Sequence, residues 1–372
     1  MHVNNHEKFQ LKEVVNASGK MTILGVSKVS ENVLAAQKFG GESFFEMEEL
    51  MIQTGRYVAA KLQADDAQIV SCASAGIAQS VAALIGKGSM RHLYQPYDAS
   101  AFPNREIILP KGHNVDYGTS VELMIAQGGG VVVEAGYANA CTSDHVASLI
   151  TEKTAALFYV KSHHAVQKSM LSVAQMIELG KKHQIPVIVD AAAEEDLFTY
   201  TKLGADVVIY SGAKALNGPS SGLVVGKRDC ISWIRLQGKG IGRSMKIGKD
   251  NVFGLVQAIE DYLEAGSEDG SSMKKRLMPF VARLNEIPNV EAKVVQDASG
   301  RDIYRASVKI DGPLTALEVV AQQKAQNPAI YTREYQANHG IIEYDVRSVN
   351  EAEMEKIIAS LTSIMKNKED VQ

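Results

Sequence analysis

Residues 186–227 read PVIVDAAAEEDLFTYTKLGADVVIYSGAKALNGPSSGLVVGK. This stretch contains three short apolar runs, rich in β-branched residues and bounded by Gly and Pro, which predict buried strands: Val187–Val189, Val207–Ile209 and Leu223–Val225. Asp190 ends the first run, and Lys214 follows the second. Because open α/β sheets bind ligands at the ends of their strands, we expect the two side chains to converge on one small molecule.

The chemistry of this pair indicates that the small molecule is pyridoxal phosphate (PLP). A lysine that holds the cofactor aldehyde as a Schiff base must lose its proton near neutral pH, and burial beside cationic centres lowers the pKa of an amine. Lys214 suits this role because small residues precede it, namely Ser211, Gly212 and Ala213. The pyridine nitrogen needs a carboxylate partner to stay protonated, and Asp190 is the candidate. A close pair gains on the order of 4 kcal/mol at an effective dielectric constant of about 20, before desolvation.

Each residue also has an ordinary interpretation when it is taken alone. An aspartate at a strand end often caps a helix, and a lysine after a strand often lies on the surface. The combination of Asp190, one crossover upstream, with the Ser-Gly-Ala-Lys motif favours the cofactor site over these alternatives.

The strands of this stretch continue a rhythm that begins near residue 68. Four earlier apolar runs, mostly separated by helical segments, are Ile69–Val70, Ile107–Leu109, Val131–Val133 and Ala155–Val160. Strands that alternate with helices predict an α/β fold with a doubly wound, mostly parallel sheet, here of seven strands. The connection from Ser211 to Gly222 is too short for a crossover helix, so we expect the last strand to run antiparallel.

The same pattern predicts three segments of chain. Residues 1–67 would form an N-terminal arm with a helix over Phe45–Leu62, preceded by a break at Gly40 and Gly41. Residues 68–250 would form the large PLP-binding domain, and residues 251–372 a smaller α+β C-terminal domain.

Composition excludes several classes of protein. The 372-residue chain is 45% hydrophobic, enough for a real core, and its net charge of −4 gives no sign of a nucleic-acid footprint. No apolar run approaches the length of a membrane helix and no signal-peptide pattern opens the chain, so we expect a cytoplasmic protein without a membrane partner.

No metal or disulfide site is expected. The three cysteines, Cys72, Cys141 and Cys230, are far apart and lack CxxC spacing, so we expect small buried fillers. The acidic cluster at residues 194–196 could be drawn with Asp190 as a metal site, but it is more easily explained as a solvated first helical turn.

Several motifs resemble the fold-type I PLP enzymes, and within them the selenocysteine synthase-like group and its D-glucosaminate-6-phosphate ammonia-lyase branch. The motifs are VVNASG (14–19), AAKLQADDAQIVSCASAG (59–76), PKGHNVDYGTS (110–120), GADVVIYSGAKALNGPSSGLVVGK (204–227) and AIYTREYQANHGIIEYDVRSV (329–349). The resemblance implies the PLP-dependent transferase-like fold with a smaller C-terminal domain. It also implies a homodimer or higher homo-oligomer, because sites of this fold lie at dimer interfaces.

The resemblance assigns further residues to the cofactor. Ser74, Ala75 and Gly76 lie at a strand-to-helix turn, where small residues let backbone N–H groups approach a phosphate, although Ser74 could merely cap the helix. By position in the fold, His113 would stack on the pyridine ring, with a structural role as the alternative. His164 would bond the phenolic oxygen of the cofactor.

Other residues would bind substrate or complete the cofactor site. Ser211 would join the cofactor-binding set and His163 could face substrate. The basic, glycine-rich segment at residues 237–250 is either a flexible loop or an anion clamp built from Arg243, Lys246 and Lys249. Arginine suits the bidentate capture of a carboxylate, and the resemblance favours Arg333 over Arg347 for this task, with a surface ion pair as the alternative.

The function implied is the α,β-elimination of a 2-amino-3-hydroxy sugar acid phosphate, D-glucosaminate-6-phosphate, to 2-keto-3-deoxy-6-phosphogluconate and ammonia. Selenocysteine synthesis on seryl-tRNA is an alternative, but residues 20–25 read KMTILG where the synthases carry a pattern with His and Asn, and the short arm is expected to leave no room for a tRNA-binding domain. Another PLP lyase or aldolase, and a non-catalytic interaction protein that kept the fold, are further alternatives.

Overall fold

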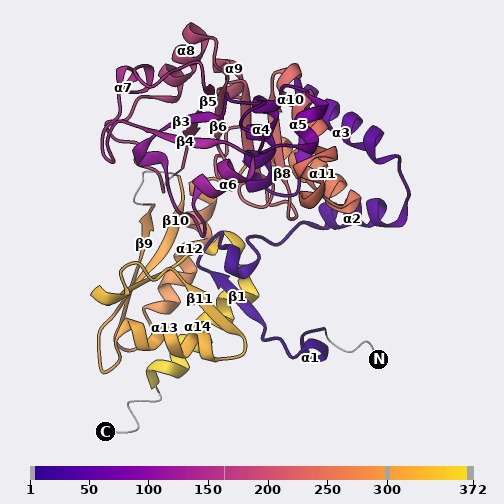
Figure 1. The fold of residues 1–372 in the computed structure, drawn as a ribbon. Helices are drawn as coiled ribbons and strands as arrows, with labels where there is room; N and C mark the ends of the chain where they lie inside the picture. Colours follow the sequence, from indigo (N-terminus) through magenta and orange to yellow (C-terminus); the bar gives the residue numbers. More distant parts are fainter. Residues whose placement is uncertain (1–4, 163, 298–301, 367–372) are drawn as a thin grey trace. The chain divides into compact units, whose positions relative to one another are not determined.

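The computed structural model describes residues 5–162, 164–297 and 302–366. The chain forms two compact units, one from residues 29–266 and the other from residues 1–28 together with 267–372 (Figure 1). We call them the large unit and the small unit and describe each by itself.

The bounds of the elements follow the chain. The helices are α1 Asn5–Phe9, α2 Glu31–Glu42, α3 Met47–Lys61, α4 Ala73–Gly86, α5 Met90–Tyr94, α6 Val121–Gln127, α7 Ser143–Ala147, α8 Val173–His183, α9 Thr199–Leu203, α10 Arg228–Leu236, α11 Lys249–Ala265, α12 Gly270–Leu284, α13 Ala316–Ala325 and α14 Glu351–Lys366. The strands are β1 Val14–Ala17, β2 Asp66–Val70, β3 Glu106–Pro110, β4 Val131–Ala135, β5 Thr154–Val160, β6 Val187–Asp190, β7 Val207–Ser211, β8 Gly222–Gly226, β9 Val290–Gln296, β10 Tyr304–Ile310, β11 Ala329–Thr332 and β12 Ile341–Tyr344.

In the described part of the chain, the large unit is built on a seven-stranded sheet with the order β2-β8-β7-β6-β5-β3-β4. Every predicted strand from residue 68 to residue 225 lies in this sheet, so the predicted α/β fold class is confirmed. The strands from β3 to β7 pair in parallel, whereas β8 is antiparallel to both β2 and β7. The strand after the short connection, β8, is therefore antiparallel, as predicted.

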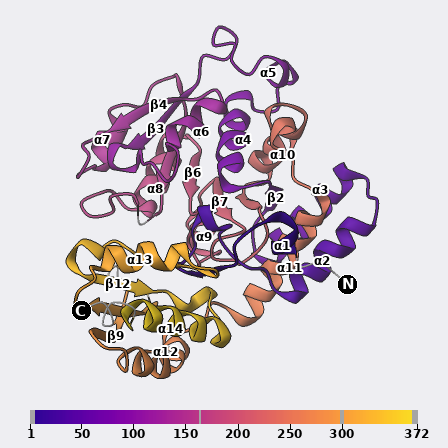
Figure 2. The same ribbon diagram turned by 90° about the horizontal axis from the view of Figure 1, so that it is seen from below.

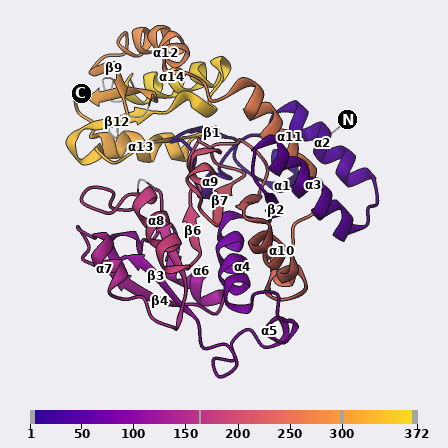
Figure 3. The ribbon, with the colours of Figure 1, turned by 90° about the horizontal axis from the view of Figure 1, so that it is seen from above.

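Helices cover both faces of this sheet (Figures 2 and 3). One apolar core joins the sheet to α4, α6 and α10, and the other joins it to α3, α7, α8, α9 and α11. Alternate residues of β7 serve the two cores: Val207 and Ile209 face one, and Val208 and Tyr210 face the other. Burial of each such side chain stabilises the fold by roughly 1.5–3 kcal/mol. The apolar runs in the sequence are thus strands buried on both faces.

The boundaries of the units differ from the predicted ones. Residues 29–67 and 251–266 belong to the large unit because α2 and α3 pack on α11. Gly40 lies inside α2, where an added Cβ would come within 2.8 Å of the Asp250 Cα atom, so this glycine permits close helix packing instead of the predicted break. The helix predicted over Phe45–Leu62 is α3.

The small unit contains the antiparallel sheet β12-β10-β9 and the parallel pair of β1 with β11. Helices α12, α13 and α14 share an apolar core with these strands, which gives the expected α+β composition. The first residues of the chain belong here because the register of β1 with β11 runs from Val14 opposite Ala329 to Ala17 opposite Thr332.

Across the described residues, no helix combines the length and the apolar character that a membrane crossing requires.

Candidate active site

Asp190 and Lys214 lie within electrostatic reach of each other at the end of the large sheet. Asp190 ends β6 and is only 5% exposed, and its Oδ1 atom accepts a hydrogen bond from the Ala192 amide at 3.1 Å. Burial raises the pKa of Asp190 to about 6, although the Ala192 amide and the charge of Lys214 act in the opposite direction. A buried carboxylate with so few partners is suited to a cationic or N–H-bearing ligand.

A closed turn after β7 presents Lys214. The Lys214 amide donates to the Ser211 carbonyl at 3.4 Å, and the Gly212 amide donates to the Ser221 carbonyl at 2.9 Å. A Cβ atom on Gly212 would lie 2.1 Å from the Ser221 hydroxyl oxygen, so only glycine fits there. The close return of the chain into β8 therefore requires glycine at position 212, and Ser211 and Lys214 are both half-buried.

One residue, Ala192, joins the two site segments through its backbone, and sequence reasoning did not identify it. The Ala192 amide binds the Asp190 carboxylate, while the Ala192 carbonyl accepts from the Ser211 amide at 3.1 Å. Asp190 and the start of the lysine turn are thus fixed relative to each other through the backbone.

The amino end of α4 lies in the same unit, after β2. Cys72 is the N-cap: its Sγ atom accepts from the Ala75 amide at 3.3 Å, and its carbonyl accepts from the Gly76 amide at 3.0 Å. Ser74 is therefore not the cap. Amides at the first positions of a helix have no acceptor within the helix, so those of Ala73 and Ser74 suit a bound anion. Gly222 closes the site from β8, since a Cβ there would lie 2.5 Å from the Cys72 carbonyl carbon.

The described cysteines are free. Cys141 and Cys230 are buried fillers, as predicted, but Cys72 is exposed because it caps α4. No group of three or more His, Cys, Asp or Glu residues capable of holding a metal occurs among the described residues. The acidic residues after Asp190 serve locally, since Glu194 accepts from the Tyr200 hydroxyl at 3.0 Å and Asp196 accepts from the Thr199 amide at 2.9 Å.

Tyr117 is a further residue of this region that sequence reasoning missed. Its hydroxyl group is buried and makes no hydrogen bond to any described residue. Burial, together with the charges of Asp190 and Cys72, raises the pKa of Tyr117 to about 12, although the neighbouring Ser74 hydroxyl lowers it. The hydroxyl group is therefore close enough to Asp190 of β6 and to the first turn of α4 for both to shift its pKa.

The geometry of His113 favours a structural role over stacking. The ring is fully buried, its Nδ1 atom accepts from the Val160 amide at 3.3 Å, and its Nε2 atom lies 3.0 Å from the Val166 carbonyl oxygen. Its edge packs against Tyr159, with ring centroids 4.4 Å apart. Burial, with a smaller contribution from the charge of Lys161, lowers the pKa of His113 to about 4 although the Val166 carbonyl acts in the opposite direction, so the ring is neutral.

The other two candidate histidines follow β5. His164 is exposed, and its backbone amide donates to the Ser162 hydroxyl at 3.2 Å. His163, which was predicted to face substrate, lies outside the described residues.

The basic segment after α10 forms a short 3-10 helix, η4 (Ile241–Met245), which contacts α4. Gly242 approaches Gln79 of α4 so closely that a Cβ would lie 2.7 Å from the Gln79 Oε1 atom. Arg243 and Lys246 are exposed on this segment. Lys249, by contrast, donates to the carbonyls of Gly40 and Gly41 at 2.5 and 2.9 Å, a favourable position for a cation at the carboxyl end of a helix. Its ammonium is already engaged.

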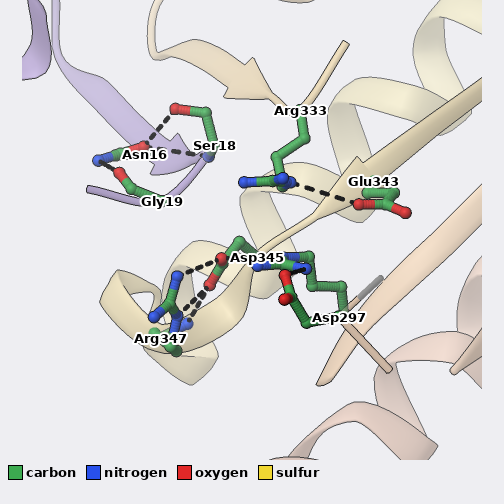
Figure 4. Close-up of polar contacts among 9 residues, drawn as sticks. Asn16, Ser18, Gly19, Asp297, Arg333, Glu343, Asp345 and Arg347 are labelled. Carbon is green, nitrogen blue, oxygen red and sulfur yellow. Dashed lines mark hydrogen bonds and ion pairs between the residues drawn. The ribbon is translucent and has the colours of Figure 1, made fainter. Parts of the chain in front are cut away.

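In the small unit, the VVNASG motif ends next to Arg333. Because Ala17 pairs with Thr332 in a parallel register, Ser18 and Arg333 follow their strands at the same edge (Figure 4). The Asn16 side chain holds this turn: its oxygen accepts from the amide and the hydroxyl of Ser18 at 3.0 and 2.8 Å, and its nitrogen donates to a carbonyl at 2.8 Å.

Arg333 is a partly exposed arginine with a loose ion pair. Its Nε atom lies 3.4 Å from a carboxylate oxygen of Glu343, and its guanidinium lies 5.0 Å from the centre of the Tyr335 ring. The Nε atom is buried and makes no hydrogen bond to any described residue. This loose pairing is compatible with capture of a carboxylate.

Arg347 takes part in a tighter network on Asp345, which Figure 4 also shows. Its Nε and terminal amino groups bind the two oxygens of Asp345 at 2.9 and 2.8 Å. Arg305 binds Asp345 at 3.1 Å and Asp297 at 2.7 Å. Although Asp345 is fully buried, the two arginines hold its pKa down at about 2. The network explains Arg347 as a structural residue.

Comparisons with known proteins place the chain among enzymes. A family model described as L-seryl-tRNA selenium transferase matches residues 98–295. A curated relative from Salmonella typhimurium, D-glucosaminate-6-phosphate ammonia lyase, is 43% identical over 373 residues and covers 100% of both chains. A relative from a Streptomyces species, 5'-C-glycyluridine monooxygenase-decarboxylase, is 35% identical and covers 98% of this chain and 92% of its own.

Solved structures agree with these relatives. A structure of D-glucosaminate-6-phosphate ammonia-lyase superimposes with a TM-score of 0.93 at 42% identity, covering 99% of each chain. An aspartate aminotransferase from Thermotoga maritima, 14% identical, matches with a TM-score of 0.52 over 97% of this chain and 94% of its own, which shows the fold alone. The architecture is that of the PLP-dependent transferase-like fold.

Proposed function

Because the chain belongs to the L-seryl-tRNA selenium transferase family, we propose that it is a PLP-dependent ammonia-lyase acting on D-glucosaminate-6-phosphate. The products would be 2-keto-3-deoxy-6-phosphogluconate and ammonia. The identity of 43% over the whole chain supports this proposal, and so does the close match to the solved ammonia-lyase. Within the structure, one observation carries it: the buried, under-partnered Asp190 carboxylate lies within reach of the charge of Lys214.

The residues of the large unit fit PLP. Asp190 would hold the proton of the pyridine nitrogen, a role that a buried carboxylate with a single amide partner can fill once an N–H group arrives. Lys214 would hold the aldehyde, and Ser211 would support the lysine turn. The first turn of α4 would receive the phosphate at the amides of Ala73 and Ser74, because the predicted Ala75 and Gly76 amides already donate to Cys72. Bound PLP supplies an electron sink for the negative charge that develops at the substrate Cα atom.

The chain's own groups would then direct the proton and the substrate. The Lys214 amine, freed when the substrate amine takes its place on the aldehyde, would accept the proton from Cα as a general base and pass a proton to the β-hydroxyl group, which would leave as water. Hydrolysis of the resulting enamine returns that water and releases ammonia, so the net products are the keto acid and ammonia.

Charged residues outside the cofactor site would bind the ends of the substrate. Arg333 would bind the α-carboxylate, because its ion pair with Glu343 is looser than the pairs that Arg347 makes with Asp345. Arg243 on η4 and Lys246 directly after it, both exposed, would bind the substrate phosphate. Lys249 is better explained as the cap of α2, and His164 is exposed and would reach the phenolic oxygen only at the edge of the site.

Two related activities are rivals. The family model carries the name of a transferase that acts on seryl-tRNA, and the Streptomyces relative carries the name of a monooxygenase-decarboxylase. Both relatives with these names share less of this sequence than the ammonia lyase does. A homo-oligomeric state and a cytoplasmic location stay predictions.

Incubation of the purified protein with D-glucosaminate-6-phosphate and PLP tests the proposal. We expect release of ammonia and a 2-keto acid in equal amounts, together with a visible absorbance band from the lysine-bound cofactor. Lys214→Ala should lose both signals. Lys227→Ala, a surface lysine paired with Asp206 in the same stretch of chain, should keep both and serves as the matched control. A colourless protein would reject the cofactor, a coloured protein without keto acid would reject the substrate, and a gel shift with seryl-tRNA would favour the transferase.

A further inference from the structure

Tyr117 stands on a well-braced loop between β3 and α6. The Val121 amide donates to the Val115 carbonyl at 3.0 Å, and the Tyr117 amide donates to the Thr119 carbonyl at 3.2 Å. Gly118 adopts a φ of 112°, and its amide binds the Asp116 carboxylate at 2.7 Å. The loop therefore fixes where the tyrosine side chain points.

Tyr117 packs against the apolar core of α4, α6 and α10, and so does the partly buried Ala73 at the start of α4. The hydroxyl at its tip is buried but has no hydrogen-bond partner among the described residues. Few buried polar groups in native proteins lack a partner, because such a group has given up its hydrogen bonds to water without replacement. A rigid loop that holds a hydroxyl in such a position indicates that its partner arrives with a ligand.

The ionisation of the phenol fixes its role as a donor. Burial first, and then the charge of Asp190, raise the pKa of Tyr117 to about 12, so the hydroxyl keeps its proton at neutral pH. A phenol of this kind cannot act as a general base near pH 7. It can donate one hydrogen bond to an acceptor.

The neighbours of the hydroxyl indicate which acceptor it meets. Ser74 and Cys72 both shift the pKa of Tyr117, so both lie near its hydroxyl group. Both belong to the turn at which α4 begins. The amides of Ala73 and Ser74 at this turn have no acceptor within the helix. Three donors, two backbone amides and one phenolic hydroxyl, are thus available near this turn, and a phosphate group offers acceptor oxygens.

We propose that Tyr117 donates a hydrogen bond to the phosphate group of the cofactor at the amino end of α4. This inference rests on the proposed function, because that function supplies the phosphate. It assigns one residue of the PKGHNVDYGTS motif, Tyr117, to cofactor binding. His113 in the same motif has a structural role, because its ring bonds to the backbone of Val160 and Val166.

A comparison of two cofactor forms tests the role of Tyr117. Binding of PLP and of pyridoxal, which lacks the phosphate, is titrated by visible absorbance in the wild type, Tyr117→Phe and Tyr137→Phe. Tyr137, 67% exposed in the same unit, is the matched control. We expect Tyr117→Phe to bind PLP about tenfold more weakly, as befits one hydrogen bond to a charged group, and to bind pyridoxal as the wild type does. Tyr137→Phe should match the wild type with both forms.

Two results would overturn the inference. Equal weakening of PLP and pyridoxal by Tyr117→Phe would mean that the hydroxyl supports the site as a whole, and unchanged affinity for both would mean that it contacts neither. In either case a wild type that still binds PLP leaves the proposed function intact. A wild type that binds neither form would remove the proposed function itself.

Discussion

Asp190 in the large unit and Asp345 in the small unit are both buried aspartates at strand ends, yet their pKa values shift in opposite directions. Asp190 has one amide partner and the distant charge of Lys214, and burial raises its pKa to about 6. Asp345 has two arginines in direct contact, which hold its pKa at about 2.

The difference teaches how the same residue type serves two purposes. Desolvation disfavours the charged carboxylate at both positions, and only Asp345 is compensated by its own chain. Asp190 is left with an unsatisfied demand for a partner, which a ligand can meet. The under-compensated charge is therefore the better indicator of a binding site, and the compensated one is a structural device.

The largest effect should come from replacing Asp190. Without its charge, Asp190→Asn should lower turnover about a thousandfold, the loss typical of removing an electrostatic stabiliser of the reacting group. The substitution should also stabilise the cofactor-free protein at pH 7.5 by up to about 3 kcal/mol, because each unit of pKa shift corresponds to about 1.4 kcal/mol.

The gain in stability from Asp190→Asn should grow as the pH rises. A raised pKa means that the cost of the buried charge is absent below the unfolded value near 3.8 and is fully present above about 6. Urea unfolding of cofactor-free wild type and Asp190→Asn should therefore give curves that converge below pH 4. A variant less stable than the wild type at pH 7.5 would break the comparison.

Replacing Asp345 should have the opposite effect on stability. Asp345→Asn leaves Arg305 and Arg347 facing a neutral amide in a buried site, and it should destabilise the fold by about 3–5 kcal/mol at pH 7. Asp311→Asn, which removes an exposed partner of Lys309, is the matched control and should change stability by less than about 1 kcal/mol. Thermal and urea unfolding would measure both, and equal effects would contradict the assigned role of the network.

His113 extends the comparison of buried ionisable residues to a base, because both of its ring nitrogens already have backbone partners. Its pKa is lowered from 6.5 to about 4, so the folded protein should lose up to about 3 kcal/mol as the pH falls from 6.5 to 4, where only the unfolded chain takes up the proton. His113→Gln should be less stable than the wild type at pH 7 but should show a flatter stability profile below pH 6.5. His183→Gln, at the exposed end of α8, should keep the wild-type slope.

The smallest predicted effect is a difference in thiol reactivity between the amino end of α4 and the buried core. Cys72 at the amino end of α4 is exposed, whereas burial raises the pKa of both Cys141 and Cys230 to about 11. A disulfide-forming thiol reagent should modify one cysteine per native chain quickly, and PLP should slow that reaction. Cys72→Ser should abolish the fast phase and change stability by less than about 1 kcal/mol, since serine also caps helices. Fast modification of the buried thiols would show that the core is less closed than described.

Much of the large unit could be predicted from local sequence. Strands buried on both faces appear as short apolar runs, as at Val187–Val189, and the short link before Leu223 required an antiparallel return. The unit boundary could not be predicted, because β1 joins the small unit by pairing with β11, far away in the chain, and local sequence carries no signal for that. The predicted break at Gly40 was wrong because a glycine that permits close helix packing cannot be told from a glycine that interrupts a helix by sequence alone.

The site divides in the same way. Lys214 and Asp190 were predictable because their neighbours in sequence create their surroundings. The proposed role of Tyr117 and the bridging position of Ala192 depend on segments that are distant in the chain, which local sequence does not show. The Tyr-Gly step at Gly118, typical of a tight turn, was the one available hint. The sequence showed that residues 237–250 are basic but not where their side chains point. Only the structure shows that Lys249 binds the carboxyl end of α2.

The pairing of β1 with β11 also has a consequence for synthesis of the protein. Residues 29–266 form a continuous piece that can collapse as soon as the ribosome has released it, whereas Val14–Ala17 must wait for Ala329–Thr332. The large unit can thus complete itself while Val14–Ala17 is still without its partner strand, and the small unit is assembled later from segments on either side of the large unit in the chain.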